Sequence, residues 1–84
     1  MKSFATKRGA GSFVAYVKVV NKAGRLLDVY IDGRYAGFLY ADESQSYTTG
    51  NGTTNARVSD AFGNTTGETF FLEPEETFTW TIQP

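Results

Sequence analysis

The nine carboxylates of this sequence are its first candidates for acid–base chemistry. The chain has no His and no Cys, so the usual general base, the thiol nucleophiles and the standard zinc ligands are absent. A glycosidase-type pair could come from Asp28, Asp32, Asp42 and Glu43. A catalytic carboxyl needs a cleft that shifts its pKa, and 84 residues leave little depth for one. We therefore expect no catalytic residues and no enzymatic activity.

Two acidic turns offer oxygen ligands for a metal ion. Glu73, Glu75 and Glu76 crowd one turn, and Asp42 and Glu43 lie in another. Calcium takes about six to eight oxygen ligands in a defined order along a loop. Neither turn has such a spacing, and acidic turns are commonly just solvated. We expect no metal site and no cofactor.

Composition and charge narrow the range of partners. The charged fraction is 20% and the formal net charge is −1, and the cations of the N-terminal end are only Lys2, Lys7 and Arg8. A nucleic-acid interface needs many more cations on one face, so we expect no nucleic-acid partner. No apolar run reaches the ~18 residues of a membrane helix, so we expect no membrane span.

The opening residues carry positive charge without the apolar stretch of a signal peptide behind it. The chain then either stays where it is made or is a piece of a longer exported protein, in which case it is extracytoplasmic. The sequence does not distinguish these two alternatives, so the localisation stays unknown. Residues 1–12 contain Gly9-Ala10-Gly11 and little to bury, and we interpret them as a flexible lead-in.

Apolar and polar residues alternate along the first two predicted strands, with the period of two that is typical of β-structure. The first begins at Phe13, and every second residue through Val19 is apolar. The second covers residues 27–31 and has one plainly polar face. Asp32-Gly33 follows it, which predicts a tight hairpin turn because Gly accepts a positive φ.

Five further segments between turn residues are predicted as strands: residues 35–40, 45–49, 54–59, 68–72 and 77–82, with a loop over 60–67. The alternation is clear in the segments 54–59 and 77–82. Gly37 inside the third strand indicates a bulge or a close backbone approach. In the last strand Phe78, Trp80 and Ile82 point to one side and three Thr residues to the other, so Trp80 is predicted to lie in the core.

Seven short strands at roughly 8–12-residue spacing predict an all-β fold, a small antiparallel β-sandwich. No segment has sustained helical periodicity, and the connections are too short for parallel crossovers. We predict one sandwich domain over residues 13–84.

Outward-facing aromatic residues are the candidate binding residues. If Val17 and Val29 point inward, Tyr16 and Tyr30 point outward and would form a stacking platform on one sheet face, to which Phe71 adds a third ring. The alternative is that these residues pack as ordinary cross-strand neighbours. Tyr35, Phe38 and Tyr40 cannot be assigned to a face because Gly37 shifts the register.

The run from Val29 to Leu39, Val-Tyr-Ile-Asp-Gly-Arg-Tyr-Ala-Gly-Phe-Leu, resembles the opening of PEGA domains, a valine-rich strand followed by a V-Y-V-D-G turn and a G-x-T/L continuation. Phe38-Leu39 stands where Thr-Pro commonly follows the second Gly of that family. A looser match, through Gly52 and Gly63, extends over residues 13–83. The resemblance implies an all-β accessory domain of a bacterial or archaeal envelope or surface protein, and carries over no functional residues.

Two functions remain open at this point. The first is a non-catalytic structural or accessory β-sandwich module, PEGA-like, of a bacterial envelope or surface protein. The second is a free-standing carbohydrate- or protein-binding domain that uses exposed Tyr residues on one sheet face. A homodimer formed through an edge strand stays open beside a monomer, because the Thr ladder of the last strand lacks the lysines that discourage edge pairing.

Overall fold

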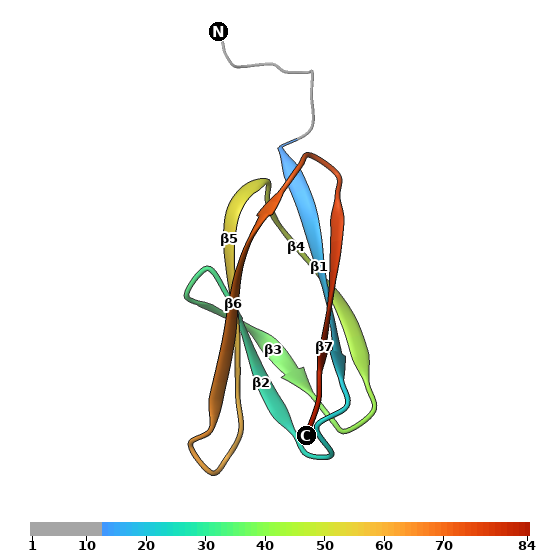
Figure 1. Cartoon of the computed structure of the whole chain (residues 1–84), viewed down its shortest axis with the longest axis vertical. Coiled ribbons are helices and arrows are strands. Elements are labelled where there is room, and N and C mark those ends of the chain that lie inside the picture. Colours follow the sequence, from blue (N-terminus) through green and yellow to red (C-terminus); the bar gives the residue numbers. More distant parts are fainter. Residues whose placement is uncertain (1–12) are drawn as a thin grey trace, which may run out of the picture.

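The structure, a computed structural model, describes residues 13–84, and the predicted lead-in at residues 1–12 lies outside these described residues. Seven strands alternate with short turns along the described part of the chain (Figure 1): β1 Val14–Asn21, β2 Leu27–Ile31, β3 Arg34–Leu39, β4 Ser44–Gly50, β5 Gly52–Ser59, β6 Thr65–Leu72 and β7 Thr77–Ile82. In residues 13–84 no helix could cross a membrane, for want of the necessary length and apolarity.

The strands form two sheets, one with the order β4-β1-β7 and the other with the order β3-β2-β5-β6. The predicted all-β sandwich is therefore confirmed. All pairings are antiparallel except that of β1 with β7, which is parallel, with Tyr16 opposite Thr77 and Asn21 opposite Ile82. The prediction that short connections exclude parallel pairs was wrong here, because the chain makes the whole second sheet before β7 returns beside β1.

The sixth strand is longer than the sequence predicts. It begins at Thr65, within the segment predicted as a loop, and Thr65 pairs with Ser59. The loop is only residues 60–64, because the buried side chain of Asp60 holds it closed: Oδ1 accepts a hydrogen bond from the backbone N–H of Asn64, and Oδ2 accepts one from Nδ2 of Asn64. Pairing of β6 with β5 therefore starts directly after this tight turn.

The hairpin turn between β2 and β3 is located where Asp32-Gly33 predicts it. Both residues have positive φ, 51° at Asp32 and 82° at Gly33, as a two-residue turn of the primed type requires. The Asp32 carboxylate also stabilises the turn, since Oδ1 accepts a hydrogen bond from the backbone N–H of Asn55 and Oδ2 one from Oγ1 of Thr49. The turn is thereby tied to β5 and to β4 of the other sheet.

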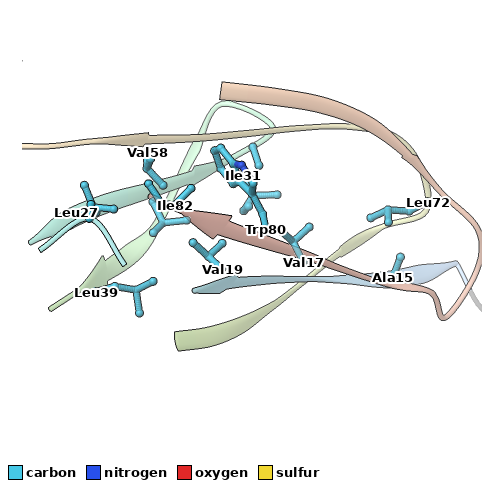
Figure 2. Close-up of a cluster of buried hydrophobic side chains, with 13 residues drawn as sticks. Ala15, Val17, Val19, Leu27, Ile31, Leu39, Val58, Leu72, Trp80 and Ile82 are labelled. Carbon is cyan, nitrogen blue, oxygen red and sulfur yellow. The ribbon is translucent and has the colours of Figure 1, made fainter. Parts of the chain in front are cut away.

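The core lies between the sheets and consists of the inward-facing residues of both. Figure 2 shows Val17, Val19 and Trp80 of the three-stranded sheet directed toward residues of the four-stranded sheet such as Ile31 and Val58. Trp80 is 8% exposed, which confirms the predicted facing of the last strand. The buried apolar residues are Ala15, Val17, Val19, Ala23, Leu27, Val29, Ile31, Leu39, Ala56, Val58, Leu72, Trp80 and Ile82.

The sandwich has two seams, at which an edge strand of one sheet lies beside an edge strand of the other, and the two seams differ. At the seam between β6 and β7 the rings of Phe70 and Phe78 stack with centroids 4.1 Å apart, and they close it. At the seam between β3 and β4 the half-buried Tyr47 packs against the core, and beside it a pocket opens. This second seam is where the aromatic and polar side chains gather.

Candidate functional site

The three candidate binding residues of the sequence do not share one surface. Tyr16 lies on β1 of the three-stranded sheet, whereas Tyr30 lies on β2 of the four-stranded sheet. Each points away from the common core, so the two rings lie on opposite outer faces of the sandwich. The expectation of a shared Tyr16–Tyr30 platform was wrong, because β1 and β2 follow each other in the chain but belong to different sheets. Phe71 is on the same outer face as Tyr30, across from Thr53, and is 63% exposed.

Other rings gather around Tyr30 in place of Tyr16. Tyr35 pairs with Tyr30 across β2 and β3, and their rings meet edge to face with centroids 5.5 Å apart. On the same outer face Phe38 meets Tyr40 at 5.4 Å. Arg57 of β5 extends over Tyr30, with its guanidinium carbon 4.4 Å from the ring centroid, a cation–π contact. We call the surface formed by Tyr30, Tyr35, Phe38, Tyr40 and Arg57 the aromatic face.

The orientation of these rings is fixed by contacts within the sheet. The hydroxyl of Tyr35 donates a hydrogen bond of 3.3 Å to Oδ1 of Asp28, one strand away. Tyr35, Phe38 and Tyr40 nevertheless remain more than half exposed. Rings held in place while still open to solvent can contact a ligand at a small cost in side-chain entropy.

A backbone irregularity in β3 determines where Tyr35 points. The register between β2 and β3 shifts between Val29 and Tyr30, so Val29 faces Gly37 while Tyr30 faces Tyr35, and Ala36 is the extra residue. Gly37 has a φ of 140°, which side-chain-bearing residues rarely adopt. Bulges of this kind re-aim side chains next to functional sites. The predicted bulge at Gly37 is confirmed, and it brings Tyr35 to the edge where the sheet meets the open seam.

The pocket at the open seam, which we call the seam pocket, has a volume of about 510 Å³ and lies between β3 and β4. Binding sites for small molecules commonly occupy some 300–1,000 Å³. Tyr35 belongs to the wall of the seam pocket as well as to the aromatic face, so the two surfaces are continuous. The lining residues are Ile31, Asp32, Arg34, Tyr35, Ala36, Tyr47, Thr48, Thr49 and Gly50.

The seam pocket presents both hydrogen-bond acceptors and donors. The Asp32 carboxylate already holds Thr49 and the backbone of Asn55, which fixes its position at the pocket wall. Among the described residues, nothing forms an ion pair or a hydrogen bond with the exposed guanidinium of Arg34. That guanidinium is the donor group with most unused capacity at this pocket.

Both tyrosines of the seam pocket keep their protons at neutral pH. Burial raises the pKa of Tyr47 above its usual value, and Tyr35 and Glu43 raise it further. Partial desolvation and then the Asp28 carboxylate raise the pKa of Tyr35. Each phenol is therefore a hydrogen-bond donor and not a nucleophile or base, which suits recognition better than catalysis.

In the two acidic turns, glutamate side chains accept hydrogen bonds from backbone N–H groups. Oε1 of Glu43 accepts a hydrogen bond from the backbone N–H of Tyr40, and Oε1 of Glu76 accepts one from that of Glu73, each at 2.8 Å. Within residues 13–84 no three carboxylates come together in a way that would hold a metal ion. These turns therefore offer no geometry on which a metal site could be argued.

No family model matches the sequence, and no curated protein matches it either.

Tyr35, Phe38 and Tyr40 were not predicted as site residues, because the sequence does not assign them to a face. The sequence nevertheless held a signal, because four aromatic residues, Tyr30, Tyr35, Phe38 and Tyr40, lie within residues 30–40. All four take part in the ring contacts described above. Arg34 was missed because only the fold brings it beside β4.

Proposed function

We propose that this chain is a non-catalytic accessory module that binds a carbohydrate through the aromatic face. The observation that carries the proposal is the gathering of fixed, solvent-open rings on one outer face. The opposite outer face carries mainly hydroxyl residues such as Thr48, Thr79 and Thr81 around Tyr16 and Lys18. A sugar ring has one apolar face, which stacks on an aromatic ring, and a rim of hydroxyl groups, which need polar partners nearby.

The neighbours of the rings favour a carbohydrate over a protein partner. Asp28, Arg57 and Asn55 share the outward-facing side of this sheet and supply acceptors and donors beside the rings. The exposed aliphatic side chains, Val14 and Leu26, lie elsewhere in the fold. Protein interfaces usually centre on a desolvated apolar core, whereas this surface interleaves rings with charged and polar groups.

The wider setting that we propose is an envelope or surface protein of a bacterium. The support is the resemblance of residues 29–39 to the opening of PEGA domains. These residues form the β2–β3 hairpin, which carries Tyr30, Tyr35 and Phe38 of the aromatic face. An accessory module that holds an envelope polysaccharide would have no need for catalytic groups of its own.

The test is a titration of the isotope-labelled protein with hexasaccharides of glucose, mannose and N-acetylglucosamine, followed by amide chemical shifts. We expect one of them to shift the amides of Tyr30, Tyr35 and Phe38, and Phe38→Ala to weaken binding by roughly threefold to tenfold, as the loss of one ring contact implies. Phe62→Ala is the matched control, because Phe62 is an 82% exposed ring on the loop after β5 and does not belong to the aromatic face. If no hexasaccharide shifts these amides, the proposal is wrong.

A further inference from the structure

The geometry points to the seam pocket as a subsite for a single sugar ring, at the end of a carbohydrate chain that continues over the aromatic face. This inference rests on the proposed function and adds to it the place where the end of the ligand is held. Three observations carry it: the asymmetry of the two seams, the polar groups of the pocket wall, and the position of Tyr35.

The asymmetry of the seams leaves one edge of the sandwich open. Between β6 and β7 the stacked Phe70 and Phe78 fill the space between the sheets. Between β3 and β4 the half-buried Tyr47 is the ring that packs against the core, and the pocket of about 510 Å³ lies beside this ring. A ligand group that enters there meets a preformed wall, and no side chain of the core must move to admit it.

The polar groups of the seam pocket suit a polyhydroxylated ring. Asp32 is an acceptor fixed by Thr49 Oγ1 at 3.2 Å and by the Asn55 backbone at 2.9 Å, and a carboxylate oxygen has lone pairs left for sugar hydroxyls. Arg34 offers a planar set of N–H donors that no described residue occupies. Of two adjacent sugar hydroxyls, one can donate a hydrogen bond to the Asp32 carboxylate while the other accepts one from the Arg34 guanidinium.

Tyr35 makes the pocket and the aromatic face into one continuous path. Its ring lines the seam pocket, meets Tyr30 at 5.5 Å and bonds Asp28 through its hydroxyl. A chain whose terminal ring occupies the pocket therefore passes Tyr35 before it reaches Tyr30 and Arg57. The bulge at Ala36 and Gly37 is what brings this ring to the boundary.

The same hexasaccharide titration tests this inference when the amides of residues 32–36 and 47–50 are followed separately from those of Tyr30 and Phe38. We expect both groups to shift with one binding curve. Methyl glycosides of the same sugars, which offer a single ring, should shift the pocket amides alone at higher concentration. Arg34→Ala should weaken hexasaccharide binding about tenfold, and Arg34→Lys should restore less than half of the loss because it lacks the planar fork. Lys18→Ala removes an exposed cation from the opposite outer face and is the matched control.

Two outcomes overturn the inference and are distinct from each other. If the hexasaccharides shift Tyr30 and Phe38 while the pocket amides stay still and Arg34→Ala binds like the parent, the seam pocket is no subsite and the proposed function stands. If no sugar shifts either group, the inference and the proposed function both fail. The melting temperature of Arg34→Ala, expected to match the parent because Arg34 is exposed, excludes misfolding as the cause of any loss.

Discussion

Nε of Arg25 donates a hydrogen bond of 2.7 Å to Oδ2 of Asp60, and this ion pair joins the loop after β1 to the loop after β5. The Asp60 side chain is 1% exposed, and it also accepts hydrogen bonds from the backbone N–H of Phe62 and from Asn64. The hydrogen bond from the Asn64 side chain, the further backbone bonds and the Arg25 guanidinium hold the pKa of Asp60 well below its usual range.

The lowered pKa of Asp60 predicts a loss of stability in acid. The folded chain favours the ionised carboxylate more than the unfolded chain does, so the stabilisation is complete above the unfolded pKa of about 4 and is lost as the pH falls toward the folded pKa. We expect the free energy of unfolding, measured with denaturant, to fall between about pH 5 and about pH 2. Asp60→Asn should be less stable at neutral pH, since its amide turns donors toward Arg25 and Asn64, and should depend less on pH. Asp42→Asn is the control, because Asp42 is 79% exposed in a surface ion pair; an equal effect in both variants would contradict the prediction.

Trp80 is predicted to be the largest single contributor of the core. It is 8% exposed and lies beside Val19 across the parallel pair of β1 and β7. Trp80→Ala should lower the free energy of unfolding by roughly 3–5 kcal/mol, because it removes a large buried ring and leaves a cavity. The neighbouring Thr79→Ala, on the exposed side of the same strand, should cost far less. A Trp80→Ala variant with the midpoint of the parent would show that the ring contributes little to packing.

Asn21 is a fully buried amide that fastens three segments together. Nδ2 donates to the carbonyl oxygens of Arg25, Leu39 and Tyr40, and Oδ1 accepts from the backbone N–H of Ala23. Asn21→Ala removes all four of these hydrogen bonds, two of which are buried, and we expect it to cost roughly 1–3 kcal/mol in denaturant unfolding.

The comparison for Asn21 is Asn51→Ala, since Asn51 is exposed in the turn between β4 and β5. That change should stay within about 0.5 kcal/mol of the parent. Similar costs at the two positions would argue against a special role for the buried amide.

A side chain at Gly37 should destabilise the fold because of the backbone conformation there, and not for lack of space. Its φ is 140°, while a Cβ placed there would be 3.9 Å from Cε1 of Tyr47, an ordinary contact. Gly37→Ala should therefore cost about 1–3 kcal/mol and shift the amides of Tyr35 and Ala36, as the bulge rearranges. Gly50→Ala has a similar contact distance, 3.9 Å to the Phe13 carbonyl oxygen, without the positive φ, and should be nearly neutral. If the two variants are equally stable, the positive φ at position 37 does not strain a residue that has a side chain.

Most of the fold follows from local patterns that the sequence displays. The alternation around Trp80 predicts which side of β7 is buried, and Asp32-Gly33 predicts the tight turn, because in each case neighbouring residues determine the geometry. The parallel pairing of β1 with β7 could not be predicted in this way, since it depends on how the intervening sheet returns the chain. The early start of β6 depends on the buried Asp60, whose partner Arg25 lies in a distant loop.

The candidate site was harder to predict than the fold. Tyr30 was correctly expected on an outer face, and it is half-buried there beneath Arg57. Its true neighbour, Tyr35, could not be assigned, because the one-residue bulge at Ala36 reverses the alternation of β3 at that point. Tyr16 was grouped with Tyr30 by an alternation that is correct within each strand but says nothing about which sheet the strand joins.

The parallel ladder between β1 and β7 also constrains how the domain is made. Until residues 77–82 are synthesised and docked, β1 is paired on one side only, with β4, and the Trp80 ring that covers Val19 is missing from the interior. Contacts between strands so far apart in the sequence require the closure of a long loop. The entropy of the loop is lost before the contacts stabilise the fold, and this slows folding. The three-stranded sheet therefore cannot be complete before β7 docks beside β1, and until then the interior lacks the Trp80 ring.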